Sequence, residues 1–404
     1  MSGAANAGAG PSRILVIGAR DSSFAGSENR GFAIDLLQSP ERLTRFQEEQ
    51  ADRVVVVDLD DTTEVAATAV KMHDDRPVVG VVAFHEHLLD IAVAVAEVLE
   101  VRGTCGRAVA NVRDKGITRG LAEGSGILNP RHVVPGRRRD WPAAVAQVGW
   151  PAIVKPLTGA GSEGVRLART LVELEAAADD RRGGNKRWII EEYLEGPELS
   201  VETFTGRNGT VVRAITETVT DPETFVEVGH QTPARVSPEL AERIETGVRR
   251  MMANVGLNVG PGHTEIKVVD GNPYLIETHV RYGGGRIWQM TGLTTGFYPQ
   301  AEMLADLAGD DLSPTVPAGP AAAIRFLTCP PGIVTQIDGR SRAESTAGVI
   351  EVSIGIRRGD RVHPLRSSDD RVGYVMTIGD STAAAEAAAD RAHGEIRVTT
   401  VATG

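Results

Sequence analysis

Residues 263–281 read HTEIKVVDGNPYLIETHVR, and this stretch predicts a β-hairpin. An Asp-Gly-Asn-Pro segment separates two runs of alternating polarity, the pattern of a tight turn between antiparallel strands. A turn centred on Gly271 places Glu265 directly opposite Glu277. Because side chains alternate along a strand, one face is polar and the other is core. The polar face carries Lys267, Glu265, Glu277, His279 and Arg281, and the core face carries Ile266, Val268 and Ile276.

The two opposed carboxylates of this predicted hairpin need a counter-charge. Like charges that face each other on neighbouring strands destabilise the pair. A hard divalent cation bridging carboxylate oxygens removes that repulsion, so we interpret Glu265 and Glu277 as metal ligands. Two alternatives stay open: Lys267 and Arg281 alone neutralise the pair, or the register slips.

A second candidate site is the glycine-rich segment KPLTGAGSEG at 155–164. It follows an apolar strand predicted over 151–156, so the Lys155 ammonium stands at the strand's end. Glycines let a loop aim several N–H groups into one concavity that binds phosphate oxygens, and Ser162 adds a hydroxyl donor. The spacing is not that of a P-loop. The alternative is a hairpin loop without a ligand.

The segment WIIEEYLEGPE at 188–198 predicts an apolar strand that ends in a loop. Free backbone groups at such a strand end can read the edge of an adenine, and Glu198 is then placed to accept ribose hydroxyls. A charged strand end with no ligand is the alternative.

Directly after the hairpin, RYGGGRI at 281–287 places two arginines around three glycines. Glycines permit close backbone approach to a ligand, and Arg281 and Arg286 can clamp phosphate or carboxylate groups. We favour this interpretation over a loop of solvated arginines because the segment follows the acidic hairpin.

The N-terminal part of the chain predicts an open parallel α/β domain. Near-continuous β-branched runs that alternate with helices indicate a parallel sheet covered on both faces. The segment Gly18-Ala19-Arg20 ends the first strand but lacks G-x-G-x-x-G, which counts against a dinucleotide site. Strands are expected at 13–18, 53–58 and 77–84, and helices near 30–50, 62–73 and 87–101.

The central and C-terminal parts of the chain predict further elements. Besides the segments described above, strands are expected at 165–168, 187–193, 322–327, 348–356 and 374–379, and helices near 171–179, 238–255 and 382–393.

The composition excludes several classes of protein. The net charge of −11 opposes binding to a nucleic-acid backbone. Two cysteines in 404 residues exclude a disulfide scaffold. The chain shows neither an apolar segment long enough to span a membrane nor the apolar core of a signal peptide. We therefore expect a cytoplasmic protein with no nucleic-acid or membrane partner.

Five motifs occur in order along the chain: Arg113-Asp-Lys115, IVKP with its glycine loop, EEYLEGPE, Glu265, and E-x-H-x-R-x-G-G. Together they resemble the ATP-grasp superfamily, and within it the carboxylate–amine ligases that include bacterial L-amino-acid (dipeptide) ligases. The resemblance covers nearly the whole chain and implies a multidomain α/β and α+β fold. Its expected parts are an N-terminal α/β domain at 1–112, an ATP-grasp domain at 113–310 with a mobile lid at about 145–205, and a C-terminal lobe at 311–404.

The resemblance also implies a role for each candidate residue. Lys115 and Lys155 would hold the phosphates of ATP, under a lid formed by Gly159, Gly161, Ser162 and Gly164. The adenine would be framed by Glu191, Glu192, Tyr193 and Leu194, and the ribose held by Glu198. Glu265 and Glu277 would bind Mg²⁺, Arg281 would stabilise the transferring phosphoryl group, and Arg286 is a further candidate beside the reacting groups.

Two residues depart from the family pattern. Tyr282 stands where a small or aliphatic residue is common, and we expect it to shape the acceptor pocket. The other departure is at position 279. The family usually has Asn two residues after the second metal-binding Glu, and this chain has His279. A neutral imidazole can bind Mg²⁺ but suits Mn²⁺ better, so His279 is a candidate ligand of a second metal. The alternative is a hydrogen bond to a neighbouring carboxylate. His230 and His279 are the candidate bases for the amine, although a lone histidine is more often structural.

The expected function is ATP-dependent coupling of a small carboxylic acid, an amino acid in the simplest case, to an amine. The cofactors would be ATP and Mg²⁺, with Mn²⁺ as a substitute, and the partners would be the small-molecule acid and amine within a homodimer. The alternatives are an ATP-grasp carboxylase or formyl-phosphate transferase, and a non-catalytic nucleotide-binding module. The complete set of lysines, acids and Arg281 argues against the last of these.

Overall fold

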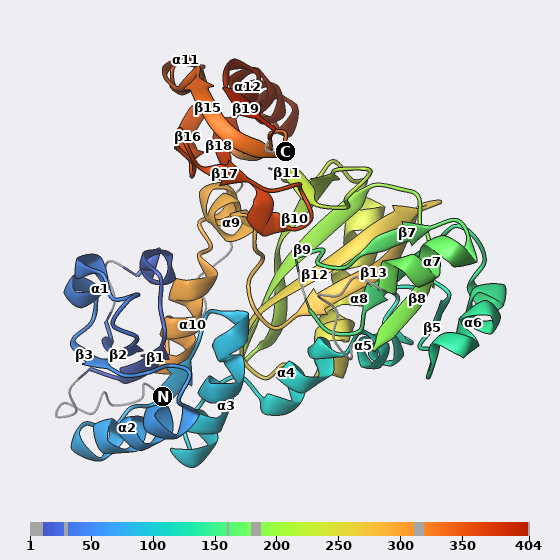
Figure 1. Ribbon diagram of the computed structural model, residues 1–404. Coiled ribbons are helices and arrows are strands. Elements are labelled where there is room, and N and C mark those ends of the chain that lie inside the picture. The colour runs from blue at the N-terminus through green and yellow to red at the C-terminus, as the bar shows by residue number, and fades with distance from the viewer. Residues whose placement is uncertain (1–10, 28–30, 160, 179–186, 311–318, 403–404) are drawn as a thin grey trace.

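The protein forms three lobes (Figure 1). The computed structural model describes residues 11–27, 31–159, 161–178, 187–310 and 319–402. In Figure 1 the N-terminal lobe lies at lower left, the C-terminal lobe at the top and the central lobe at right.

A four-stranded parallel sheet builds the N-terminal lobe, as the sequence predicts. Its order is β3 (Arg53–Val56), β2 (Ala33–Gln38), β1 (Arg13–Ile17) and β4 (Gly80–Val82). The helix expected near 30–50 is wrong: this stretch forms β2 and only a short helix, α1 (Arg45–Gln50). The run AIDLLQ is buried along its whole length beside β1, where Arg13 pairs with Asp35 at 2.7 Å, so tertiary pairing decides its conformation.

The two faces of this sheet are covered by helices from different parts of the chain. Helices α2 (Thr62–Asp75) and α3 (Leu89–Val98) follow the sheet's own strands and cover one face. The other face packs against α10 (Pro299–Ala308), whose Leu304 and Leu307 contact the core around Ile14 and Ile34. The central part of the chain thus completes the N-terminal core.

An eight-stranded sheet runs through the central lobe into the C-terminal lobe. Its order is β13 (Asn272–His279), β12 (Gly260–Val269), β9 (Glu198–Gly206), β10 (Gly209–Thr220), β11 (Glu227–Thr232), β14 (Ala321–Leu327), β18 (Gly373–Gly379) and β16 (Val349–Ile354). The sequence predicts the hairpin, β14, β16 and β18 but not β9, β10 and β11, whose Thr- and Glu-rich alternation lacks a continuous apolar run. The division of the chain at residue 311 stays a prediction.

A smaller antiparallel sheet stands over one end of the hairpin. Its order is β5 (His132–Val133), β8 (Trp188–Glu192), β6 (Ala152–Pro156) and β7 (Arg166–Ala168), with α6 (Trp141–Val148) and α7 (Leu171–Ala178) beside it. The predicted strands at 151–156, 165–168 and 187–193 are confirmed here. The helix expected to end at 179 is observed to residue 178, and residue 179 lies outside the described ranges.

Helix α8 (Pro238–Val255) supports the hairpin from behind and follows its predicted bounds. Ser237 caps its first turn by accepting from Leu240 N, and Gly256 ends it with a left-handed φ of 83°. Its buried Val248 and Met252 share a core with Ile266 and Leu275 of the hairpin. Helix α8 therefore packs against the apolar side chains of the hairpin, and the acidic side chains Glu265 and Glu277 line the cleft.

The remaining elements flank these sheets. They are α4 (Gly106–Arg113), α5 (Lys115–Ala122), α9 (Ile287–Thr295), α11 (Arg340–Glu344), α12 (Thr382–Glu395), and a sheet of β17 (Arg361–Val362), β15 (Gly332–Asp338) and β19 (Arg397–Val401). Within the described ranges, no helix combines the length and apolarity needed to cross a membrane.

Candidate active site

A cleft of about 820 Å³ lies between the small sheet and the β12–β13 hairpin. It gathers residues from six separate parts of the sequence: Lys115, Pro130, 153–165, 191–198, Phe225 and 265–277. Among the predicted site residues, those that line it are Lys115, Lys155, Gly159, Ser162, Glu191, Glu192, Tyr193, Leu194, Glu198, Glu265 and Glu277.

The hairpin has the predicted register at the acids. Glu265 pairs with Glu277, but the register then shifts between Glu265 and Ile266, so that Ile266 pairs with Leu275. This bulge leaves Ile276 without a partner residue on β12. The prediction that Ile276 is core is therefore wrong: Leu275 is buried in the core, and Ile276 lines the cleft. A bulge re-aims side chains and frees backbone groups, and the Ile276 carbonyl accepts from Arg119 Nη2 at 2.8 Å.

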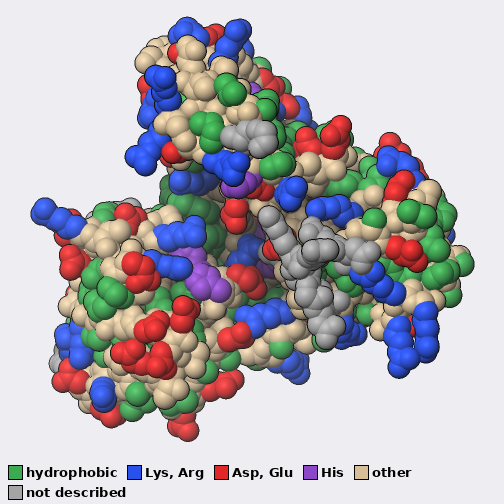
Figure 2. Space-filling view, viewed as in Figure 1, with side chains coloured by type: hydrophobic (Ala, Val, Ile, Leu, Met, Phe, Trp, Pro, Cys, Tyr) green, Lys and Arg blue, Asp and Glu red, His purple; other side chains and the backbone are tan. Residues whose placement is uncertain are grey.

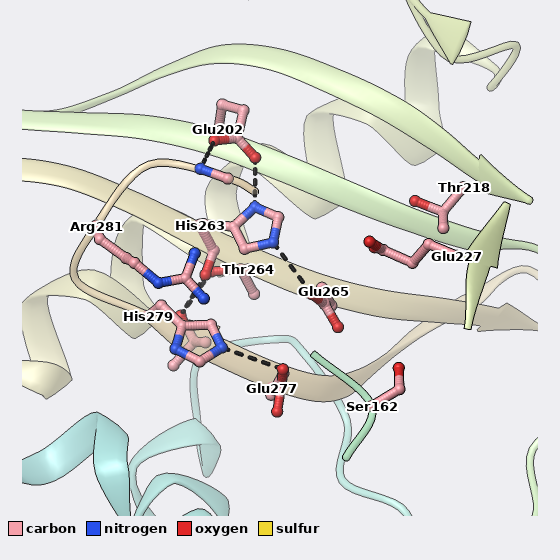
Figure 3. A network of polar contacts seen from close by, with 12 residues as sticks. Ser162, Glu202, Thr218, Glu227, His263, Thr264, Glu265, Glu277, His279 and Arg281 are labelled. Atoms are coloured by element: carbon pink, nitrogen blue, oxygen red, sulfur yellow. Dashed lines mark hydrogen bonds and ion pairs between the residues drawn. The ribbon is translucent and has the colours of Figure 1, made fainter. Parts of the chain in front are cut away.

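Each of the two opposed carboxylates has its own cationic partner, His263 for Glu265 and Lys115 for Glu277. Figure 3 shows the hydrogen bonds of the two acids to His263 and His279. Glu277 lies 3.0 Å from Lys115 Nζ and accepts from His279 Nε2 at 3.1 Å. Burial opposes the ionisation of Glu277, but Lys115 and His279 outweigh it and hold its pKa well below the ordinary value. The alternative in which Lys267 and Arg281 neutralise the pair is not observed, because Lys267 pairs with Glu198 and Arg281 with Glu86.

On the other strand, His263 lies between two acids. Its Nδ1 is 2.5 Å from Glu202 and its Nε2 is 3.1 Å from Glu265. Because carboxylates only accept hydrogen bonds, both ring nitrogens must donate, which requires an imidazolium. Burial opposes this charge, but Glu202 and Glu265 raise the pKa of His263 to about 10. Glu202 also accepts from Gly283 N at 3.0 Å, which ties the triglycine loop to β9.

Lys155 is held at the cleft wall by a buried ion-pair cluster. Glu191 accepts from Lys155 Nζ and from Arg119 Nε, both at 2.7 Å. Burial lowers the pKa of Lys155, whereas Arg119 and Lys155 overcome burial and hold the pKa of Glu191 at about 2. The Glu191 carboxylate, which lies on β8, therefore holds the Lys155 ammonium in position. The family resemblance places Glu191 at the adenine and does not indicate this contact.

The glycine-rich loop reaches across the cleft. Lys115 Nζ donates to the Gly159 carbonyl at 2.8 Å, and Ser162 Oγ donates to the Phe225 carbonyl at 2.9 Å. Ser162 itself has a left-handed φ of 62°. Gly161 lines a second, larger cleft, and Gly164 packs on Pro156, where a Cβ would lie 3.1 Å from that ring. The loop thus stands between two clefts.

The expected adenine and ribose positions lie on the opposite wall. The Glu192 N–H donates to the Arg131 carbonyl at 2.9 Å, so only its carbonyl is a candidate reader of a base. Burial, with Glu265 nearby, raises the pKa of Glu198 to about 8. A protonated Glu198 can donate as well as accept, which suits a diol. These assignments stay predictions.

The donor set fits a magnesium ion that arrives with a nucleotide. Mg²⁺ is usually held by one or two carboxylates together with phosphate oxygens and water, and Glu265 and Glu277 present such a pair to the cleft. In the described ranges no group of three or more His, Cys, Asp or Glu side chains could hold a metal by itself. His279, 5% exposed, bonds to Glu277, and its role as a ligand stays a prediction.

The second cleft, about 2900 Å³, lies between the N-terminal sheet, the triglycine loop and the C-terminal lobe. Figure 2 shows it as the hollow where the three lobes meet. Arg281 and Arg286 both line it, as does Tyr282. Arg281 Nε donates to Glu86 at 2.9 Å, and the Arg286 guanidinium lies 4.9 Å from the centre of the Tyr374 ring. The two predicted arginines therefore face this cleft, next to the hairpin.

His230 is fully buried beside the triglycine loop. Its Nδ1 lies 3.2 Å from Thr218 Oγ1, and a Cβ on Gly285 would come within 2.6 Å of its Nε2. Burial, with the Arg371 charge, lowers its pKa to about 3. The imidazole is thus neutral but a weak base, and its role as the base for the amine stays a prediction.

The sequence did not predict four contributors to the site: Arg119, Glu202, Glu86 and the charge of His263. Arg119 stands four residues after Lys115, a spacing that places both on one helix face. Glu198 and Glu202 alternate with apolar residues in ELSVETFTG, a pattern that points to one face of a strand. Glu86 gives no such signal.

Comparisons with known proteins agree with this geometry. Residues 148–289 match a family model described as an ATP-grasp domain, and residues 325–401 match one described as L-amino acid ligase C-terminal domain 2. The crystal structure of an L-amino acid ligase from Bacillus licheniformis matches with a TM-score of 0.82 at 21% identity, covering 96% of this chain and 99% of that chain. The predicted family resemblance and fold class are confirmed.

Matches to curated relatives cover a smaller share of each chain. A protein of Sinorhizobium fredii without an assigned function is 30% identical over 273 residues, which is 64% of this chain and 56% of that protein. The alanine–anticapsin ligase of Bacillus subtilis is 27% identical over 222 residues, 48% of this chain and 46% of that enzyme. The chain spans about half the length of the curated relatives it matches.

Proposed function

We propose that this chain uses ATP to join a small carboxylic acid to an amine. Its matches to the ATP-grasp domain and to the C-terminal domain 2 of the L-amino acid ligases support this function. The acid is an amino acid in the simplest case. The observation that carries the proposal is the combination in one cleft wall of Glu265, Glu277, Lys115 and Lys155 with a separate, larger cleft beside Arg281.

The chemistry explains why such a site needs both clefts. A carboxylate is a poor electrophile because its leaving group would be oxide. Attack of a carboxylate oxygen on the γ-phosphorus of ATP releases ADP and forms an acyl phosphate. The amine nitrogen then attacks the acyl carbon, phosphate leaves, and the nitrogen loses a proton to give the amide. One cleft would hold the nucleotide and the other the acid and amine.

The residues of the chain supply position and charge. Lys115 and Lys155 would neutralise phosphate oxygens as the terminal phosphoryl group transfers, which is the main demand of this reaction class. Arg281 would bind the transferring group from the larger cleft. The loop with Gly159 and Ser162 would exclude water, which otherwise hydrolyses an acyl phosphate. A magnesium ion held by Glu265 and Glu277 would supply further charge neutralisation for the phosphates.

Ion-pair exchange is the physical feature behind this proposal. Lys115 is paired with Glu277 and Lys155 with Glu191, at 3.0 and 2.7 Å. A phosphate oxygen and a metal ion can replace the partners of Lys115 and Glu277 at the same time. No buried charge is then left uncompensated during binding, which would be costly.

The test is release of ADP and phosphate by the purified chain with ATP and Mg²⁺. Pools of amino acids and small organic acids are screened with and without an amine. We expect release that requires both an acid and an amine, together with a new amide detected by mass spectrometry. Release with bicarbonate or formate in place of the acid would favour a carboxylase or formyl-phosphate transferase. Nucleotide binding with no release in any pool would favour a binding module.

A further inference from the structure

The larger cleft holds a group of basic side chains that the proposed reaction leaves without a role. We call Arg20, Arg42, His85 and His87 the basic patch; all four line this cleft. They follow the carboxyl ends of β1, β2 and β4, the edge at which parallel sheets bind ligands. Figure 2 shows His and basic side chains together where the N-terminal lobe borders the hollow.

The patch is a structured group. The rings of His85 and His87 stack with centroids 6.0 Å apart and planes at 18°. Arg42 Nη1 lies 3.3 Å from His87 Nε2, so the guanidinium donates to that ring. Four nitrogen-rich side chains from three loops therefore converge on one wall.

The patch has no internal counter-ion. Across the described ranges, neither Arg20 nor Arg42 forms an ion pair, and the buried His85 Nε2 has no hydrogen-bond partner. Two acids of the cleft wall near the patch have other partners. Asp21 accepts from Thr44 Oγ1 at 2.6 Å and Gln47 Nε2 at 3.1 Å, and Glu86 accepts from Arg281 Nε. An orphaned nitrogen among unpaired cations indicates a site that takes an anion from outside the chain.

The electrostatics of the two rings agree with this arrangement. Burial, Arg20, His87 and Arg42 together lower the pKa of His85 to about 4. Burial, Arg42 and Arg20 also lower the pKa of His87, although Asp60 and Glu86 act in the opposite direction. At both rings the arginines outweigh the acids, so the field at the patch is positive and an anion bound there would reduce it.

Glu86 places the patch next to the reaction centre. It lies between His85 and His87 in the sequence, and its carboxylate accepts from Arg281 Nε at 2.9 Å. The loop that carries the two rings is therefore fastened to the arginine that would bind the transferring phosphoryl group. A small molecule whose reacting carboxylate or amine lies beside Arg281 can reach the basic patch within the same cleft.

We propose that the basic patch binds a second anionic group, a carboxylate or a phosphate, on one of the two small-molecule substrates. The word substrate rests on the proposed ligase function, whereas the binding of an anion does not. The patch would then select a dicarboxylic or phosphorylated compound over one with an uncharged side chain.

Anion binding is tested first, without turnover. The full chain with ring-labelled histidine is titrated at low salt with inorganic phosphate, succinate and acetate, and the His85 and His87 signals are followed by NMR. We expect saturable shifts with phosphate or succinate, and weaker binding of acetate. The double variant Arg20→Gln/Arg42→Gln should weaken binding by about tenfold or more. Which dianion binds more tightly distinguishes a carboxylate from a phosphate.

The matched control removes two arginines from the opposite edge of the same sheet. Arg53 and Arg76 both lie beside Asp75, at 3.0 and 3.8 Å, and do not line the cleft in the described structure. Arg53→Gln/Arg76→Gln should bind as the unchanged chain does. Equal loss in both double variants, or equal affinity in all three proteins, would overturn the proposal by showing a general charge effect or no site.

Turnover separates this proposal from the ligase function. With a dianionic substrate, Arg20→Gln/Arg42→Gln should raise KM with little change in kcat. Saturable anion binding without any ADP release would leave the patch standing and remove the ligase proposal. ADP release from substrates with no second anionic group, unaffected by the double variant, would remove the patch and leave the ligase.

Discussion

Glu265 and Glu277 are paired directly across the β12–β13 hairpin, yet each carboxylate is neutralised by a different cation of the protein. His263 Nε2 lies 3.1 Å from the Glu265 carboxylate, and Lys115 Nζ lies 3.0 Å from the Glu277 carboxylate. The repulsion expected from the sequence is therefore already compensated. The stability of the hairpin therefore does not require a metal ion here, and under the proposed function a magnesium ion would serve the phosphates.

Glu277→Gln should abolish ADP release, because an amide is a much weaker ligand for Mg²⁺ than a carboxylate. The change should also destabilise the fold, on the order of 3 kcal/mol, because Lys115 loses its buried counter-charge. Repulsion between the opposed carboxylates would by itself predict slight stabilisation of the metal-free variant, but the Lys115 contact argues against this. Phosphate release and urea denaturation measure the two effects.

The matched control for this variant is Glu245→Gln. Glu245 lies on α8 and pairs with Arg249 at the surface, so both activity and stability should change little. Near-normal turnover in Glu277→Gln would remove this residue from the metal site.

Lys155→Ala should weaken ATP binding by about 1.5–3 kcal/mol if the ammonium contacts a phosphate. It should also lower stability, because Glu191 keeps only Arg119 as a partner in a buried position. Calorimetry of ATP binding measures the first effect, with Lys71→Ala, an exposed position on α2, as the control. Unchanged affinity would place Lys155 outside the nucleotide site.

His279→Asn should keep Mg²⁺-supported ADP release close to that of the unchanged chain. Asn can replace the hydrogen bond that His279 Nε2 donates to Glu277, whereas His279→Ala cannot and should lower activity. If His279 binds the second metal itself, the Asn variant will instead lose preferentially the activity supported by Mn²⁺, which suits imidazole better than Mg²⁺ does. The ratio of rates with the two metals decides between these roles.

The pH dependence of stability should carry a contribution from His230. Its pKa is about 3 in the folded chain, against about 6.5 for a free imidazole. The unfolded state therefore binds more protons between these values, and the free energy of unfolding falls as the pH drops through this window, by up to about 1.4 kcal/mol per pH unit. Above about pH 6.5 the contribution is constant.

Urea denaturation of the unchanged chain and of His230→Gln between pH 5 and about 7 tests this slope. The variant should lose stability less steeply as the pH falls. His393, whose pKa burial also lowers, is present in both proteins and cancels. Parallel curves for the two proteins would show that His230 is protonated in the fold or exposed to water.

The sequence alone was sufficient to predict several local elements and many of the residues that line the first cleft. The Asp-Gly turn with φ of 49° and 73° sets the hairpin and brings Glu265 opposite Glu277. The helix expected near 238–255 is likewise observed with these bounds, between the caps Ser237 and Gly256. Such features depend on neighbours a few residues apart, so the local pattern is sufficient to predict them.

The pairing of the charges depends on the tertiary structure. Arg119 reaches Glu191 across 72 residues, Glu202 reaches His263 across 61, and Arg281 reaches Glu86 across 195. The bulge that exposes Ile276, and the pairing that makes 33–38 a strand, also depend on elements distant in sequence. The physical reason is that an ion pair or a ladder bond becomes favourable only after the chain has brought its partners together and removed water. Such energies leave no periodic signal in the residues themselves.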